Sequence, residues 1–124
     1  MTERARPQVE LRRVYEDIPS GDQTRVLVDR LWPRGIAKAT APFDQWLKEV
    51  APTTELRRWY GHEPAKFETF VTRYLAELAQ PPASVALAHL RALAAKDGVV
   101  LVTATRDVEH SAAEVLLDAL LGPD

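Results

Sequence analysis

One unbroken apolar stretch near the C-terminus narrows the possible folds more than any other feature of the chain. Residues 99–105 read Val-Val-Leu-Val-Thr-Ala-Thr. A strand with one face in water alternates apolar and polar residues, whereas a continuous apolar strand lies inside a sheet that is covered on both faces. The stretch therefore predicts a central β-strand with a layer of structure on each side.

Further strands and helices are predicted by spacing. Residues 25–29 form a short, valine-rich stretch between turn residues and predict a second buried strand, and the alternation over residues 9–15 predicts another. Apolar residues at helical spacing predict helices at 43–50, from Thr53 or Thr54 to Gly61, at 64–80, at 84–97 and after Ser111. Buried strands separated by helices favour parallel pairing. We predict an α/β domain with a small, mostly parallel sheet of about three strands covered by about five helices.

Turn-forming residues predict the helix ends. Pro52 stops the first helix, Thr53 or Thr54 caps the second, and Gly61 closes it. Pro64 opens the longest helix. Its apolar residues form one stripe: Phe67, Phe70, Val71, Tyr74, Leu75 and Leu78. Ser84 is expected to cap the helix that follows.

Length and composition limit the class of protein. With 124 residues, the chain fits one domain, here residues 9–124 after a flexible tail at 1–8. A net charge of −2 argues against a broad nucleic-acid-binding surface. The absence of cysteine excludes disulfides and thiolate chemistry, and the three histidines lack metal-ligand spacing, so no metal or cofactor is predicted. No apolar stretch approaches the roughly 20 residues of a membrane span, and no signal peptide is apparent, so we expect a cytoplasmic protein without membrane contact.

The second strand runs directly into a charged turn, residues 29–35, which reads Asp-Arg-Leu-Trp-Pro-Arg-Gly. Pro33 fixes φ and removes a backbone donor, while Gly35 permits positive φ. In α/β proteins, ligands bind beyond the carboxyl ends of the strands, which favours a binding role for Asp29, Arg30 and Arg34. A structural turn in which the aspartate and an arginine pair with each other fits the same residues.

The last strand also ends in polar residues, at 103–111, before a helix start that favours an anion. If the two strands are parallel neighbours, Arg106 joins Arg30 and Arg34, and guanidinium groups suit carboxylate or phosphate. The hydroxyls of Thr103, Thr105 and Ser111 would add hydrogen bonds. The alternative is a solvated pair of Arg106 with Asp107 and a helix cap at Ser111.

The remaining candidates complete a predicted site. Asp29 would orient an arginine or act as a base, and His62 would carry a proton, although a helix-end cap suits His62 equally well. Further anion ligands would be Lys48 and Arg57. The pocket would be lined by Trp32 and Trp46, because an exposed tryptophan in a turn is costly.

Several segments resemble the YeaO-like family, domain-of-unknown-function family 488. They are residues 25–36 (Arg-Val-Leu-Val-Asp-Arg-Leu-Trp-Pro-Arg-Gly-Ile), 46–52, 54–57, Phe70 and 74–78. The resemblance runs from about Val14 to the last helix and implies a compact cytoplasmic α/β domain without a known cofactor. The family usually has an aromatic and then a small residue before a basic one after the last strand, whereas residues 102–106 here read Val-Thr-Ala-Thr-Arg.

Two functions from different classes follow. The leading prediction is an anion-binding domain, with the question of enzymatic activity open, for a phosphate- or carboxylate-bearing metabolite or nucleotide. The rival is a non-catalytic, regulatory module that binds nucleic acid or protein through Arg4, Arg6, Arg12 and Arg13.

Overall fold

A parallel sheet forms the centre of the protein in a computed structural model that describes residues 8–18 and 21–122. Within those residues the sheet has four strands in the order β1-β4-β2-β3, and every neighbouring pair is parallel. The strands are β1 (Val9–Arg13), β2 (Thr24–Leu27), β3 (Gln45–Trp46) and β4 (Val99–Thr103). The predicted class, a mostly parallel α/β sheet, is confirmed, and β3 is added to the three expected strands.

The central position predicted for the C-terminal strand is confirmed. All five residues of β4 are buried. On one side β4 pairs with β1, from Val9 opposite Val99 to Arg13 opposite Thr103, and on the other side it pairs with β2. The carboxyl ends of strands that are far apart in the sequence therefore lie side by side, and we call this end of the sheet its carboxyl edge.

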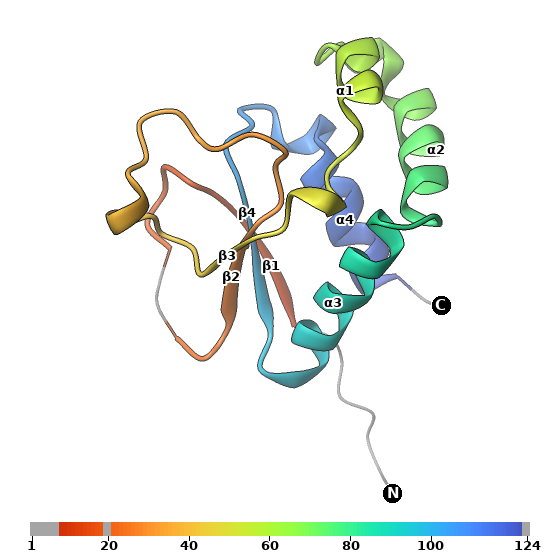
Figure 1. Cartoon of the computed structure of the whole chain (residues 1–124). Helices are drawn as coiled ribbons and strands as arrows, with labels where there is room; N and C mark the ends of the chain where they lie inside the picture. Colours follow the sequence, from red (N-terminus) through yellow and green to blue (C-terminus); the bar gives the residue numbers. More distant parts are fainter. Residues whose placement is uncertain (1–7, 19–20, 123–124) are drawn as a thin grey trace, which may run out of the picture.

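The two faces of the sheet are covered differently (Figure 1). The helices gather on one face, where Val26, Val99 and Leu101 join the larger core cluster. Long loops cover the other face, where Leu27 and Val102 belong to a second, smaller cluster. Successive strand residues point to opposite faces, so both faces need apolar residues, and this accounts for the unbroken apolar sequence of β4.

Four α-helices and four short 3₁₀ helices lie in the described residues. The α-helices are α1 (Thr54–Tyr60), α2 (Phe67–Leu78), α3 (Ala83–Lys96) and α4 (Ala112–Leu121), and the 3₁₀ helices are η1 (Lys38–Thr40), η2 (Lys48–Val50), η3 (Pro64–Lys66) and η4 (Val108–His110). None of these helices is both long enough and apolar enough to cross a membrane.

Most predicted helix ends are confirmed. The Thr53 hydroxyl accepts a hydrogen bond from the N–H of Leu56 and caps α1, which ends at Gly61 with φ +55°. Pro64 opens η3, which leads into α2. The predicted cap at Ser84 is wrong, because α3 already begins at Ala83 and has no side-chain cap bond.

The predicted helix at 43–50 is also wrong, because this segment pairs with β2. The N–H of Asp44 donates to the carbonyl of Arg25 (2.7 Å), and the N–H of Leu47 donates to the carbonyl of Leu27 (2.9 Å). Only η2 remains helical. A helix of eight residues has little stability of its own, so neighbouring strand contacts decide the conformation.

The predicted tail, residues 1–8, lies outside the described residues except for Gln8. The backbone of Gln8 donates to the carbonyl of Ala94 (3.2 Å) and accepts from the N–H of Val99 (2.9 Å). Gln8 is therefore tied to the start of β4.

Candidate functional site at the carboxyl edge of the sheet

The two predicted strand ends meet through the side chain of Asp29. One carboxylate oxygen accepts a hydrogen bond from the hydroxyl of Thr103 (2.7 Å), and the other accepts from the N–H of Ala104 (2.8 Å). The N–H of Thr105 in turn donates to the Thr103 hydroxyl (3.2 Å). The turn after β2 is therefore fastened to the end of β4, and Asp29, Thr103 and Thr105 form one connected group.

Burial changes the acidity of this carboxyl group. Removal from water raises the pKa of Asp29, and the hydrogen bonds from Ala104 and Thr103 lower it by a smaller amount. Both oxygens already have a protein donor. The arrangement therefore stabilises the strand ends and holds a carboxyl group that resists ionisation.

The neighbouring Arg30 is directed toward backbone carbonyls. Its Nε donates to the carbonyl of Pro52 (2.9 Å), and a terminal nitrogen donates to the carbonyl of Ala51 (3.2 Å). These bonds connect the turn to the segment between η2 and α1. The predicted pairing of Asp29 with an arginine of its own turn does not occur among the ion pairs of the described residues.

The predicted pocket tryptophans pack against each other in the same region. The rings of Trp32 and Trp46 meet edge to face, with centroids 5.5 Å apart, and Phe43 lies 5.1 Å from Trp32. The indole N–H of Trp46 donates to the carbonyl of Asp29 (2.7 Å). The ammonium of Lys48 lies 5.4 Å from the centre of the Trp46 ring. The cluster of aromatic rings thus packs against the turn and is bonded to it through the Asp29 carbonyl.

Arg13, the last residue of β1, and Tyr15, just beyond it, complete the edge; Arg13 was predicted only as part of the rival basic surface, and Tyr15 was not predicted as a site residue. The Nε of Arg13 donates to the carbonyl of Thr105 (3.0 Å), and its guanidinium carbon lies 5.5 Å from the centre of the Tyr15 ring. The Tyr15 hydroxyl donates to the carbonyl of Arg34 (2.8 Å). The ends of β1, β2 and β4 are therefore linked, a result that depends on the pairing of β1 with β4.

Three arginines occupy this edge, and we refer to Arg13, Arg34 and Arg106 as the edge arginines. Arg34 and Arg106 are exposed, and Arg13 is half-buried. No ion pair among residues 8–18 and 21–122 involves any of them. The predicted pair of Arg106 with Asp107 is wrong, since Asp107 instead pairs with Nδ1 of His110 (2.9 Å).

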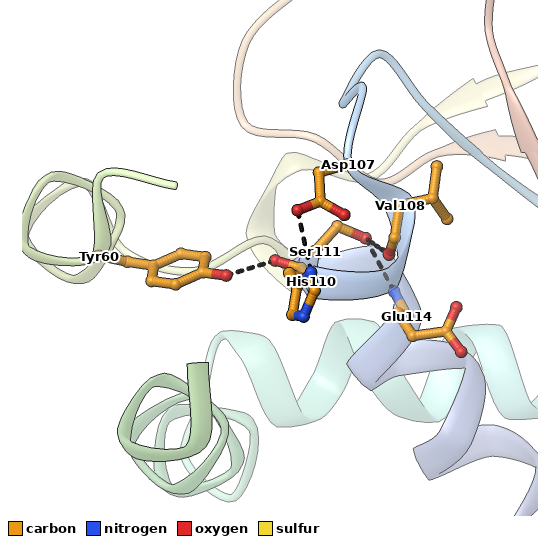
Figure 2. A network of polar contacts seen from close by, with 6 residues as sticks. All are labelled: Tyr60, Asp107, Val108, His110, Ser111 and Glu114. Carbon is orange, nitrogen blue, oxygen red and sulfur yellow. Dashed lines mark hydrogen bonds and ion pairs between the residues drawn. The ribbon is translucent and has the colours of Figure 1, made fainter. Parts of the chain in front are cut away.

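Other predicted site residues lie on separate elements. His62 is exposed, with φ +57°, and makes no hydrogen bond to Asp29, although both residues are described. Arg57 is exposed on α1. Ser111 is buried and caps α4: its hydroxyl donates to the carbonyl of Val108 (2.7 Å) and accepts from the N–H of Glu114 (Figure 2). The alternative cap role of Ser111 is confirmed.

The basic residues of the rival prediction do not form one described surface. Arg4 and Arg6 lie outside the described residues. Arg12 is within 3.4 Å of the Glu10 carboxylate. In the part of the chain that the structure covers, no group of three or more histidine, aspartate or glutamate side chains is placed to hold a metal ion.

Fold and site together define a small parallel α/β domain whose strand ends are joined through the partly buried carboxyl group of Asp29. The chain belongs to the DUF488 family: the model of the inactive DUF488-N3 subclade matches residues 8–123. The resemblance to YeaO-like proteins is thereby confirmed.

Relatives match over most of their length. The chain is 50% identical over 115 residues to the uncharacterised protein Rv3073c of Mycobacterium tuberculosis (strain H37Rv), covering 93% of this chain and 95% of that protein. It is 39% identical over 112 residues to the uncharacterised protein YeaO of Escherichia coli (strain K12), covering 90% and 96%. No solved structure matches the chain.

Proposed function

We propose that this protein is a non-catalytic domain that binds a small anion at the carboxyl edge of its sheet. The observation that carries the proposal is the placement of Arg13. Its guanidinium is fixed through Nε to the carbonyl of Thr105 and lies over the Tyr15 ring, so its terminal nitrogens keep a constant direction. A fixed guanidinium fork suits the paired oxygens of a carboxylate or phosphate.

The other two edge arginines add positive charge beside it. Arg106 follows Thr105 directly in the chain, and the backbone of Arg34 is held by the hydroxyl of Tyr15. One acidic group is bound to this segment: the exposed carboxylate of Glu16 accepts a hydrogen bond from the N–H of Arg13 (2.7 Å). Asp29 is turned to its own donors, the Thr103 hydroxyl and the Ala104 N–H. The balance at the edge is therefore positive.

Three observations support binding without turnover. Both oxygens of Asp29 are occupied, and His62, the other predicted catalytic residue, is on a separate connector. In addition, the matching family is described as an inactive subclade. In this proposal Arg30 positions the turn, and the ligand is a phosphate- or carboxylate-bearing metabolite or nucleotide.

Inorganic phosphate is the probe that tests the proposal. We expect phosphate to raise the melting temperature of the wild type above that in chloride at equal ionic strength. At about ten times its Kd, a ligand stabilises the native state by roughly 1.4 kcal/mol, which is several degrees for a domain of this size. Arg34→Gln and Arg106→Gln each reduce this shift. Arg58→Gln, an equal charge change at an exposed position of α1, preserves it.

Two results contradict the proposal. The first is the absence of a phosphate-specific shift in the wild type at millimolar phosphate. The second is a shift of equal size in all four proteins, which would mean that phosphate acts through the solvent or the net charge and not through the edge arginines.

A further inference from the structure

Helix α2 has more apolar surface than the core uses. The predicted single stripe divides into two rows. One row is buried in the main core: Phe70, Tyr74 and Leu78. The other row, four residues apart along the helix, is only partly covered: Phe67, Val71 and Leu75. Leu75 is 46% exposed, so this second row remains available for contact.

The second row forms one wall of a hollow between α2 and α4. The hollow has a volume of about 430 Å³, and its opposite wall comes from η4 and α4: Glu109, Glu114, Val115, Asp118 and Ala119. We call it the α2–α4 groove. Figure 2 shows Glu114 at the beginning of α4, next to the η4 turn that carries His110. The volume of the α2–α4 groove lies within the range of about 300–1,000 Å³ typical of binding pockets.

The groove combines this apolar wall with negative charge. Its three carboxylates are Glu109, Glu114 and Asp118, and no ion pair of the described residues includes them. One guanidinium lies at this wall: Arg91 donates to the carbonyl of Ala119 (3.4 Å) and forms no ion pair with the three carboxylates. Three carboxylates against one guanidinium leave the groove with a net negative charge.

These carboxylates also repel one another. Glu114 and Asp118 are four residues apart on α4, a spacing at which like charges destabilise a helix. Burial raises the pKa of Glu114, and the charges of Asp118 and Glu109 raise it further. A positive group placed in the groove would relieve this repulsion, so charge complementarity favours a cationic occupant.

We propose that the α2–α4 groove docks a basic amphipathic helix of a partner protein. From Phe67 to Leu75 the apolar row covers eight residue steps, about 12 Å along α2, which is the length of two turns of a docked helix. Apolar anchors of the partner would contact this row, and lysine or arginine beside them would meet the carboxylates. This site is separate from the edge arginines and stands without the anion-binding proposal.

A matched pair of synthetic peptides provides the probe. The first is helical, with leucines at i, i+3, i+4 and i+7 flanked by lysines, and the second replaces the lysines with glutamates. Fluorescence anisotropy at low salt should show binding of the lysine peptide alone. Amide chemical-shift changes in NMR spectra of the wild type should be confined to α2, η4 and α4.

Variants then distinguish binding in the groove from a general effect of the protein's net charge. Glu109→Gln/Asp118→Asn should weaken binding of the lysine peptide about fivefold, as expected for two exposed charge pairs. Leu75→Ser should weaken it about tenfold through lost apolar contact. Glu49→Gln/Glu55→Gln has the same change in charge at exposed positions on η2 and α1, and should keep the wild-type affinity.

Four outcomes would overturn the proposal. They are the absence of binding, equal binding of both peptides, equal losses in the groove and control double variants, and shift changes elsewhere in the chain. Displacement of the peptide by spermine at similar concentration would assign the groove to a small polycation. Self-association of the free protein that Leu75→Ser abolishes would assign it to a second copy of the chain.

Discussion

At the scale of single residues, Asp29 is the contact on which the carboxyl edge depends. It accepts one hydrogen bond from the hydroxyl of Thr103, the last residue of β4, and one from the N–H of Ala104, the residue that follows. In Asp29→Asn, an amide N–H₂ replaces one acceptor and faces a donor. An unsatisfied partly buried donor costs about 1–3 kcal/mol. Urea denaturation should therefore show a loss of that size at neutral pH, and an unchanged midpoint would contradict this role.

The same variant has a defined pH dependence. Burial gives Asp29 a pKa above its ordinary value of 3.8 in the folded protein. The folded state then holds its proton more tightly than the unfolded state, so the stabilising contribution is complete below pH 3.8 and is lost as the pH rises through the folded pKa. The difference in unfolding free energy between wild type and Asp29→Asn should shrink as the pH rises above 3.8.

Asp44→Asn is the control for the direction of this change. Its hydrogen bonds with Arg25 hold the pKa of Asp44 below 3.8. The contribution of Asp44 is therefore present above pH 3.8 and is lost as the pH falls through the folded pKa. The wild type and Asp44→Asn should differ more as the pH rises, opposite to Asp29→Asn, and equal slopes would contradict both assignments.

At the scale of elements, two consecutive left-handed residues end α1. Gly61 has φ +55° and His62 has φ +57°. An added Cβ at Gly61 would meet no atom closer than the carbonyl of Arg58, 3.7 Å away. The cost of Gly61→Ala is therefore conformational, about 1 kcal/mol. Thermal or urea denaturation should show this loss.

His62→Gly is the matched control, because it places glycine where a non-glycine residue already has positive φ. The relief of strain and the greater freedom of the unfolded chain nearly cancel, so the stability should change by less than about 0.5 kcal/mol. Equal destabilisation by both substitutions would show that the backbone conformation is not the cause.

Local signals were sufficient for the elements whose environment is set by nearby residues. The apolar sequence of β4, the threonine cap at Thr53 and the glycine at Gly61 each predicted their structure correctly. The segment at 43–50 had helical spacing, but its N–H groups bond to β2 carbonyls, and this tertiary pairing is invisible in the spacing. Sequence patterns predict local conformation better than the identity of a distant strand neighbour.

The same distinction applies to the candidate site. The two polar strand ends were identified, and they meet at Asp29 and Thr103. Arg13 was not recognised as their neighbour, since its contact with Thr105 joins residues 92 positions apart. Arg30 was predicted as an anion ligand, and its carbonyl partners at Ala51 and Pro52, which come from another loop, could not be read from its own segment. Contacts between residues on different strands could be predicted only if the order of the strands in the sheet were known.

At the scale of the whole molecule, stability should be highest along β4. It is buried on both faces and bonded to strands on both sides, whereas β3 is a two-residue edge strand with exposed side chains. Amides in β4 should open only with global unfolding. Hydrogen exchange should be at least about 100-fold slower there than in β3 once intrinsic rates are corrected, and similar protection would contradict this hierarchy.

The position of β4 also affects when the protein can fold. β1 and β2 leave the ribosome before β4, the strand that lies between them, because β4 follows both of them in the chain by three α-helices. Until β4 emerges, β1 and β2 lack the strand that pairs with both of them, and the sheet cannot assemble by local pairing. The native sheet is therefore completed only after β4 has been synthesised, and until then these segments need protection from aggregation.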